Sequence, residues 1–480
     1  MLETNWWTNE ENIQWQQDYN KSIMGKDVIA VFDIGKTNKK FFLFDMDFKE
    51  VHRDYTFLEP IVDEDGHSTE NLVELQKWIK STFHNILKSK DYNVTAVNFS
   101  SYGASFVHLD DMGNVVTPLY NYTKPIKGEV VDQFYEKYGP EITFSRETGT
   151  TKEGMLNSGI QLYWLKHEKP ELFSKIKCSL HLPQYLSYLF TGIQVSEYTS
   201  IGCHTALWNY EKQDYHDWVY QEGIHKILPP IVDTGTSINT KLMGHKLKIG
   251  VGIHDSSSAL LPYIRSIDKK FLLLSTGTWS IALNPFSKEL LTQEDTASNC
   301  INYMRINGEP VKAARLFLGN EYNEKIKELA LLFGVSEDHH KSVAFDPVLH
   351  QNLQDNFKHK FRWTSLDVQS PDDLAPMEFQ NYEEAYHQLM MELVELQIES
   401  IQRAIGDDKI KQLYIDGGFT NNQIFVELLA RGFKGMKVKT TDASLGSALG
   451  AAIVISDVEL DQKFLKNNYA LKKHRPLIIN

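Results

Sequence analysis

Short apolar runs of strand length alternate with longer amphipathic stretches of helix length over most of the 480 residues. Near the N-terminus, Val28 to Phe32 and Phe41 to Asp45 are rich in β-branched and aromatic residues, and a polar turn containing Gly35 separates them. This pattern predicts a β-hairpin with a polar tip. A further run, Thr95 to Phe99, predicts a strand that ends at Ser100-Ser101-Tyr102-Gly103.

The second half of the chain begins the same pattern again. Phe271 to Leu274 and Ser280 to Leu283 flank the small-residue turn Ser275-Thr276-Gly277-Thr278, which predicts a second hairpin. Leucines three or four residues apart between Tyr382 and Ile405 predict a long helix that is buried on a broad face. Leu413 to Ile415 predicts a strand that ends at Asp416-Gly417-Gly418. The chain is therefore predicted to have an α/β fold.

Two helices and a loop region complete this outline. Ser158 to His167 and Pro183 to Phe190 have helical patterns, and Thr191-Gly192 ends the second one. The stretch from about Ser336 to Asn381 is polar and irregular, so we expect loops there. The length predicts two large domains, with the boundary near Pro262 to Ser266. We expect domains at residues 27–263 and 264–480, preceded by an extension at residues 1–26.

Charge and cysteine usage limit the possible partners. The formal net charge is -13 and the pI is about 5.7, which argues against nucleic acid or an anionic membrane surface as a partner. No run of about 18 apolar residues and no signal peptide is apparent, so we expect a cytoplasmic protein. Cys178, Cys203 and Cys300 are far apart, and we expect reduced, mostly core cysteines. A homodimer is the commonest assembly for an enzyme of this size.

Three small-residue turns that follow strands carry the chemistry. They begin at Asp33, Ser275 and Asp416. Glycine lets the backbone approach an anion closely, free N–H groups and hydroxyls can bind its oxygens, and an aspartate can hold a cation beside it. Each turn alone is also compatible with an ordinary tight turn. Two such hairpins that open the two halves, together with a late Gly-Gly turn, make a much rarer combination.

A different turn, Gly250-Val251-Gly252-Ile253-His254-Asp255, lies between the two halves. It is followed by serines and then by apolar residues, so Asp255 is predicted to lie where a strand ends and a helix begins. A carboxylate at such an exposed sheet edge suits a general base. Aspartate is also a good helix N-cap, and the pattern alone does not choose between the two roles.

Together these segments resemble the FGGY family of carbohydrate kinases, which belongs to the superfamily of actin, hexokinase and the heat-shock chaperone ATPases. The matching segments are VFDIGKTNKKFFLFD, GVGIHDSS, LLSTGTWSIAL, YIDGGFTNN and GSALGAAIV, and their order and spacing match over nearly the whole chain. Three segments resemble the rhamnulokinase and fuculokinase branch: residues 100–122, residues 182–200 and STGTWS. The resemblance implies two ribonuclease H-like, actin-like ATPase domains that enclose a central cleft.

The resemblance also implies roles for individual residues. Asp255 would be the catalytic base, and His254, Tyr102 and Gly103 would bind the sugar, with Glu197 and Tyr198 in the wall of its site. Asp33 would lie near Mg²⁺ through water. The ATP-binding residues would be Asp33, Gly35, Lys36, Thr37, Gly277, Thr278, Gly417, Gly418 and Asn422. The family pattern has an acidic residue at Ser105, and Asp and Arg in the segment occupied here by residues 120–124, so this sugar pocket differs.

The implied function is transfer of the γ-phosphoryl group of ATP to a hydroxyl of a small-molecule ketose. The acceptor would be C1 of a deoxyketohexose such as L-rhamnulose or L-fuculose, or alternatively a pentulose such as xylulose or ribulose. A non-catalytic ATP-binding member of the superfold and a two-carboxylate sugar hydrolase are the rival functions. His339-His340 could suggest a metal, but nothing at ligand spacing accompanies the pair, so a solvated loop is predicted there. Trp279 could stack on a base, but a tryptophan after a hairpin turn is more often a core residue.

Overall fold

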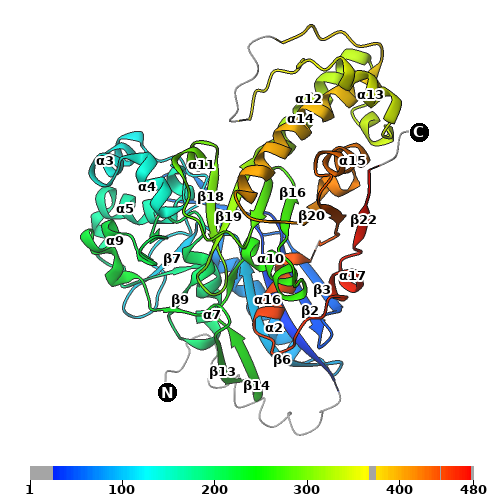
Figure 1. The fold of residues 1–480 in the computed structure, drawn as a ribbon. Helices are drawn as coiled ribbons and strands as arrows, with labels where there is room; N and C mark the ends of the chain where they lie inside the picture. The colour runs from blue at the N-terminus through cyan, green and yellow to red at the C-terminus, as the bar shows by residue number, and fades with distance from the viewer. Residues whose placement is uncertain (1–24, 367–373, 444, 477–480) are drawn as a thin grey trace. The chain divides into compact units, whose positions relative to one another are not determined.

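The computed structural model describes residues 25–366, 374–443 and 445–476, whose course Figure 1 shows. The chain divides into two compact units. Unit 1 consists of Met1–Arg265, Asn302–Pro310 and Leu445–Leu460, and unit 2 consists of Ser266–Ile301, Val311–Ser444 and Asp461–Asn480. The units are therefore not two continuous halves of the chain. The predicted extension, residues 1–26, lies outside the described residues except for its last two.

Unit 1 is built on a mixed sheet in the order β13-β14-β6-β1-β2-β3, with β15 paired to β6. Its strands are β1 (Lys26–Ile34), β2 (Lys39–Asp45), β3 (Glu50–Thr56), β6 (Tyr92–Ser101), β13 (Ser237–Leu242), β14 (His245–Gly250) and β15 (Ile253–His254). The hairpin β1-β2 is antiparallel, whereas β6 runs parallel to β1. Helices α2 (Leu72–Leu87), α7 (Leu182–Thr191) and α16 (Gly446–Val454) pack against β6. The predicted first hairpin is confirmed.

A second, mainly helical core belongs to the same unit. It gathers aromatic residues from α3 (Gly128–Tyr138), α4 (Glu141–Thr148), α5 (Ser158–Glu168) and α9 (Asp217–Gln221). Phe134 lies at its centre, with the rings of Tyr163 and Trp218 at centroid distances of 5.0 and 5.1 Å. The edge-to-face geometry of both pairs is the one that aromatic rings prefer. The predicted helices at 158–167 and 183–190 are therefore confirmed as α5 and α7.

Unit 2 has a sheet in the order β18-β19-β17-β16-β20-β21-β22. The strands of this sheet are β16 (Leu272–Thr276), β17 (Ser280–Asn284), β18 (Cys300–Met304), β19 (Pro310–Leu316), β20 (Gln412–Gly417), β21 (Lys437–Thr440) and β22 (Lys472–His474). Residues 302–304 of β18 and Pro310 of β19 are assigned to unit 1. Helices α12 (Leu318–Phe333) and α14 (Tyr382–Ile405) run side by side, and α15 (Gln423–Gly432) packs on α14 (Figure 1). The long helix and the second hairpin are confirmed.

The two sheets repeat one pattern. In each, an antiparallel hairpin is followed in space by a strand parallel to its first arm: β6 beside β1 in unit 1, and β20 beside β16 in unit 2. The carboxyl ends of these parallel strands meet at one edge of their sheet, where ligands bind in open α/β sheets. The predicted α/β fold is confirmed, and the repeat places each small-residue turn at such an edge.

Two predictions about unit 2 are wrong. The region between Ser336 and Asn381 was expected to be loops, but it contains α13 (Pro347–Asp355). Asp346 caps this helix by accepting the N–H groups of Val348 and Leu349. Trp279 was expected in the core, but it is 38% exposed, since the hairpin alternation turns Ser280 inward instead. Its ring lies 4.6 Å from that of Phe317.

Candidate active site

The first hairpin and the Gly-x-His-Asp turn meet at one edge of the unit 1 sheet. Asp33 of β1 is paired with Ser100 of β6, and Ile253 of β15 is paired with the same serine from the other side. Asp255 follows β15 by one residue and begins α10 (Asp255–Ser266). The register therefore brings Asp33 and Asp255, more than two hundred residues apart in sequence, to neighbouring positions.

Asp33 is a buried carboxylate whose negative charge is only partly stabilised by its neighbours. Its residue is 7% exposed, and the Ser447 hydroxyl donates a hydrogen bond to Oδ1 at 2.9 Å. The pKa of Asp33 is raised to about 6, mainly by burial and also by the charge of Asp255, although Lys40 and the Ser447 hydrogen bond act in the opposite direction. A cation beside this carboxylate would favour its charged form. The site therefore fits a divalent cation carried by a nucleotide.

Asp255 has one occupied and one open oxygen. Its Oδ1 accepts hydrogen bonds from the N–H of Ser256 at 2.6 Å and from the hydroxyl of the same residue at 3.2 Å. Among the described residues, none donates a hydrogen bond to Oδ2. A helix N-cap side chain accepts the backbone N–H of the second or third residue after it. In the part of the chain that the structure describes, the Asp255 carboxylate accepts neither of these N–H groups. The side chain is 34% exposed, so Oδ2 can accept a proton from a ligand.

His254 is buried beside Asp255. Its Nε2 lies 3.1 Å from Asp255 Oδ1 and 3.0 Å from Cys203 Sγ. Burial lowers the pKa of His254, against the effect of Asp255, so the imidazole is neutral at neutral pH. A Cβ on Gly103 would lie 3.0 Å from the Cys203 sulfur and 3.1 Å from the His254 ring, so glycine permits this close packing. Gly103 and His254, both predicted to bind the sugar, therefore lie in contact.

The predicted sugar and phosphate residues share an aromatic cluster. The Lys36 ammonium lies 5.2 Å from the ring centroids of both Tyr102 and Tyr122, within the range of cation–π attraction. Burial lowers the pKa of Lys36 and raises that of Tyr122, which the charge of Asp255 also raises. Thr37 is exposed at the hairpin tip. Gly35 closes the turn by donating its N–H to the Asn38 carbonyl at 3.0 Å.

Glu70 is a residue of this region that sequence reasoning missed. It is 6% exposed, its carboxylate lies 2.9 Å from Lys39 Nζ, and it accepts the Tyr102 hydroxyl at 3.2 Å. This ion pair fixes both the first hairpin and Tyr102. Glu70 stands thirty-one residues after Lys39 in a polar stretch, so only tertiary packing reveals the contact.

Glu197, predicted in the wall of the sugar site, is fully buried. Its residue is 0% exposed, and its oxygens accept the N–H groups of Thr199 and Ser200. The hydroxyls of Thr199 and Thr234 donate to it as well. The carboxylate caps the short helix α8 (Tyr198–Ile201) and has no free lone pair directed at a ligand.

The two predicted turns of unit 2 lie side by side. Thr276 of β16 is paired with Gly417 of β20, and the Thr276 hydroxyl donates to the Asp416 carbonyl at 2.5 Å. Gly417 has φ +90°, and a Cβ there would lie 1.9 Å from the Thr276 carbonyl oxygen, so only glycine fits. By contrast, a Cβ on Gly277 would meet nothing nearer than 3.8 Å, and Gly418 faces open space. This open backbone fits the approach of a phosphate chain.

Helix α12 supports the second hairpin turn. Gly319 and Asn320 both donate their N–H groups to the Thr278 carbonyl, at 3.1 and 3.2 Å. A Cβ on Gly319 would lie 1.9 Å from the Gly277 carbonyl oxygen. The first turn of the helix is thereby locked onto the predicted phosphate turn, and its geometry depends on this glycine.

The side chain of Asn422, which was predicted to contact the adenosine, makes hydrogen bonds to other residues of unit 2. Its side-chain oxygen accepts the N–H of Phe425 and so caps α15, and its amide donates to the Tyr386 hydroxyl at 2.9 Å. The structure therefore brings Gly277, Thr278, Gly417 and Gly418 together, while the Asn422 side chain serves the helix. A contact of Asn422 with nucleotide stays a prediction.

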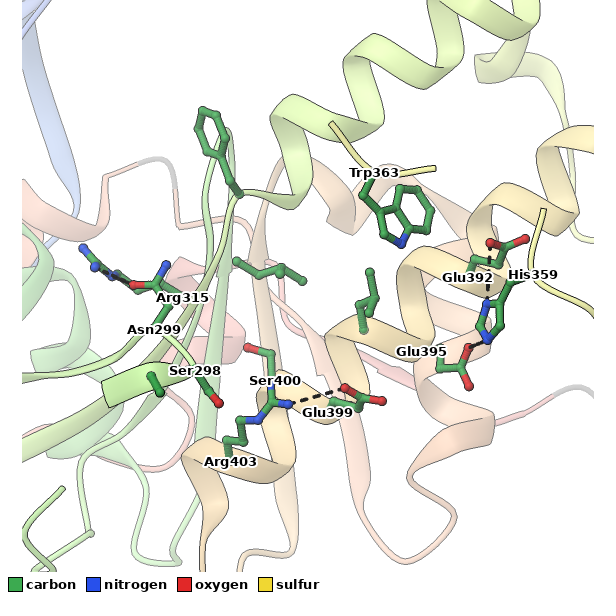
Figure 2. Close-up of a pocket in the computed structure, with 14 residues that line it drawn as sticks. Ser298, Asn299, Arg315, His359, Trp363, Glu392, Glu395, Glu399, Ser400 and Arg403 are labelled. Carbon is green, nitrogen blue, oxygen red and sulfur yellow. Dashed lines mark hydrogen bonds and ion pairs between the residues drawn. The ribbon is translucent and has the colours of Figure 1, made fainter. Parts of the chain in front are cut away.

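A separate cavity of about 400 Å³ in unit 2 lies between the end of β19 and α14 (Figure 2). His359 lies between Glu392 and Glu395, 3.7 Å from each carboxylate, and Trp363 lies beside them. None of the predicted site residues lines this cavity. The nucleotide is therefore not assigned to it.

Metal centres and membrane spans are both absent from the described residues. No group of three or more His, Cys, Asp or Glu side chains gathers there as a metal centre, so a cation at Asp33 would need ligands from nucleotide and water. None of the described helices combines the length and apolar character of a membrane span. Cys178, Cys203 and Cys300 are buried and not joined by disulfides.

Comparison with known proteins gives a consistent family. Residues 28–260 match the model of the FGGY family of carbohydrate kinases, N-terminal domain. A rhamnulokinase of Halalkalibacterium halodurans is 26% identical over 258 residues, so the match spans only about half of that protein, 52%, and 52% of this chain. A rhamnulokinase of Pectobacterium atrosepticum is 24% identical, and the match covers 94% of this chain and 93% of that protein.

Solved structures agree on the fold. The crystal structure of a carbohydrate kinase from Novosphingobium aromaticivorans matches with a TM-score of 0.77 at 23% identity, and covers 95% of each chain. Structures of similar fold also include xylulose, gluconate and glycerol kinases. The fold alone therefore does not select the sugar.

Proposed function

We propose that this chain, whose residues 28–260 match the N-terminal domain model of the FGGY family of carbohydrate kinases, is a kinase for a small-molecule sugar. It transfers the γ-phosphoryl group of ATP to a ketose hydroxyl, with Asp255 as the base. The observation that carries the proposal is the position of Asp255. Its Oδ2 is open, its Oδ1 is held by Ser256, and Asp33 lies beside it. A base needs an accessible lone pair at a fixed position.

ATP bound with Mg²⁺ would supply the γ-phosphoryl group, with ADP as the leaving group. In unit 1, Asp33 would hold the cation through water, and Lys36 with the backbone at Gly35 and Thr37 would bind the terminal phosphates. In unit 2, the open turns at Gly277-Thr278 and Gly417-Gly418 bind the phosphate chain through backbone N–H groups. A nucleotide fits here because the space beside the Cα atoms of Gly277 and Gly418 is open: a Cβ at either position would clash with no neighbouring atom.

Asp255 Oδ2 accepts the proton of the sugar hydroxyl while that oxygen bonds to the γ-phosphorus and the bond from phosphorus to the bridging oxygen of ADP breaks. The sugar is bound by His254, Tyr102 and Gly103. The curated relatives are named rhamnulokinases, which supports a deoxyketohexose such as L-rhamnulose as the acceptor. L-Fuculose is a further candidate, and C1 is the proposed position of transfer. A pentulose such as xylulose or ribulose is the alternative acceptor.

A coupled assay of ADP release with a panel of ketoses tests this function. We expect ADP release that requires a ketose, and a preference for L-rhamnulose or L-fuculose over the pentuloses. Sugar-independent ADP release would favour the non-catalytic, chaperone-like alternative instead.

Asp255→Asn tests the base. The amide cannot accept the proton, so we expect the rate to fall about 10² to 10⁴-fold or more while ATP binding persists. Asp457→Asn is the control, because this carboxylate of the same unit is 99% exposed, and it should leave the rate unchanged. Near-normal turnover of Asp255→Asn would exclude it as the base.

A further inference from the structure

A buried hydrogen-bond chain holds the turn that carries Asp255. It begins at Glu197, which is fully buried and accepts the Thr199 hydroxyl at 2.8 and 2.9 Å. The Thr199 oxygen in turn accepts the backbone N–H of His254 at 3.0 Å. Both side chains are buried, with Thr199 at 0% exposure. This series of hydrogen bonds therefore connects a structural carboxylate, Glu197, to His254, the residue that precedes the proposed base.

The direction of these hydrogen bonds is fixed by chemistry. An ionised carboxylate only accepts, so the one hydroxyl proton of Thr199 is directed at Glu197. A lone pair of the same oxygen is then left to accept from His254. Removing the hydroxyl would leave the buried N–H of His254 without this acceptor. Because an unsatisfied buried N–H costs free energy, we expect the backbone at His254 to shift toward another partner.

Other anchors act further back in the turn. The Ser187 hydroxyl donates to the Gly250 carbonyl at 2.7 Å, and Asn98 accepts the N–H of Gly252 at 3.1 Å. Gly252 has φ +87° and packs against the backbone of Pro183. These contacts fix residues 250–252, whereas Thr199 is the side-chain anchor at the position next to Asp255.

We propose that Thr199 is a positioning residue for phosphoryl transfer, whose hydroxyl holds the backbone of His254 and thereby the place of Asp255. The inference rests on the proposed role of Asp255 as base. A displacement of about 1 Å in a reacting group costs on the order of 100-fold in rate. A small shift of this turn would therefore affect transfer to the sugar far more than it would affect binding of ATP.

The chain offers a matched control. Thr234 is also 0% exposed and also donates its hydroxyl to Glu197, but it does not contact the Asp255 turn. Thr199→Val and Thr234→Val thus remove the same kind of hydrogen bond from the same carboxylate. Only the first variant removes the acceptor for His254. Thr199→Ser restores the hydroxyl at that position.

The experiment compares the three variants with the wild type in steady-state kinetics with the preferred ketose, alongside thermal melting. For Thr199→Val we expect kcat for sugar phosphorylation to fall about 10- to 100-fold, with an unchanged KM for ATP and unchanged sugar-independent ATP hydrolysis. Thr199→Ser should recover most of the rate. Thr234→Val should retain near-wild-type kcat even if it melts at a similarly lowered temperature.

Two results would overturn the proposal. Equal losses of kcat in Thr199→Val and Thr234→Val would mean that both act through stability of the α8 region. Wild-type kcat in a folded Thr199→Val would mean that the hydroxyl does not set the position of the base. Failure of the proposed function is distinguishable from both, because the wild type itself would then show no ketose-dependent ADP release.

Discussion

Replacing Asp33 by Asn should make the folded protein more stable, and by an amount that depends on pH. Asp33 is buried, and its pKa of about 6 stands above an ordinary value of 3.8. Between these two values the folded state holds a proton that the unfolded chain has released. Stability therefore falls as the pH rises through this window, and the full cost is present above about pH 6.

The magnitude follows from the difference between the two pKa values. At 1.36 kcal/mol per pKa unit, the rise from 3.8 to about 6 corresponds to about 3 kcal/mol. Asn carries no charge, and its amide oxygen keeps the hydrogen bond from Ser447. We therefore expect Asp33→Asn to be more stable than the wild type by about 3 kcal/mol at pH 8 and by about half of that at pH 5.

Urea unfolding without nucleotide or Mg²⁺, followed by tryptophan fluorescence from pH 5 to pH 8, measures this difference. Asp45→Asn is the control of opposite sign. Burial raises the pKa of Asp45, but the hydrogen bonds from Lys26 and from backbone N–H groups outweigh it, so its pKa lies below the ordinary value. This variant should be less stable than the wild type. An Asp33→Asn protein that is no more stable at pH 8, or whose advantage does not change with pH, would refute the reasoning.

The remaining predictions concern unit 2. Gly277→Val introduces a side chain into open space, so it should raise the KM for ATP several-fold in initial-rate assays without lowering the melting temperature; unchanged ATP kinetics would remove this turn from the site. Gly319→Ala should lower both stability and ATP affinity, because its Cβ would lie 1.9 Å from a carbonyl oxygen. Asn422→Ala removes a helix cap and should cost about 1 kcal/mol in urea unfolding; an unchanged KM for ATP would contradict its predicted nucleotide contact.

The elements that the sequence predicts best are those with strong local signals. The hairpins are specified by runs of β-branched and aromatic residues on both sides of a small-residue turn, and α14 by its leucine spacing. Helix α13 was missed although Asp346-Pro347 is an N-cap followed by a proline at the first helical position. Its polar composition hid that signal, because only one of its residues, His350, is buried.

The candidate site was predicted in its turns but not in its supports. The glycines and small residues around Gly35, Gly277 and Gly417 are a local signal for a tight turn, so these turns can be predicted from the sequence. Glu70 and Thr199 cannot, because their importance lies in partners far away along the chain, Lys39 and His254. For the same reason the sequence does not show that five hydrogen-bond donors surround the Glu197 carboxylate.

The contrast between Glu197 and Asp33 separates structural from functional carboxylates. Both are buried, but Glu197 accepts hydrogen bonds from two backbone N–H groups, two hydroxyls and the Gln184 amide, and so its burial is compensated within unit 1. Asp33 receives the Ser447 hydroxyl and lies beside a second carboxylate, Asp255, which opposes its ionisation. Under the proposed function, a bound cation would supply the missing compensation. The wild type should therefore gain more stability from Mg²⁺ with ATP than Asp33→Asn does, which ties the stability cost of this carboxylate to its proposed function.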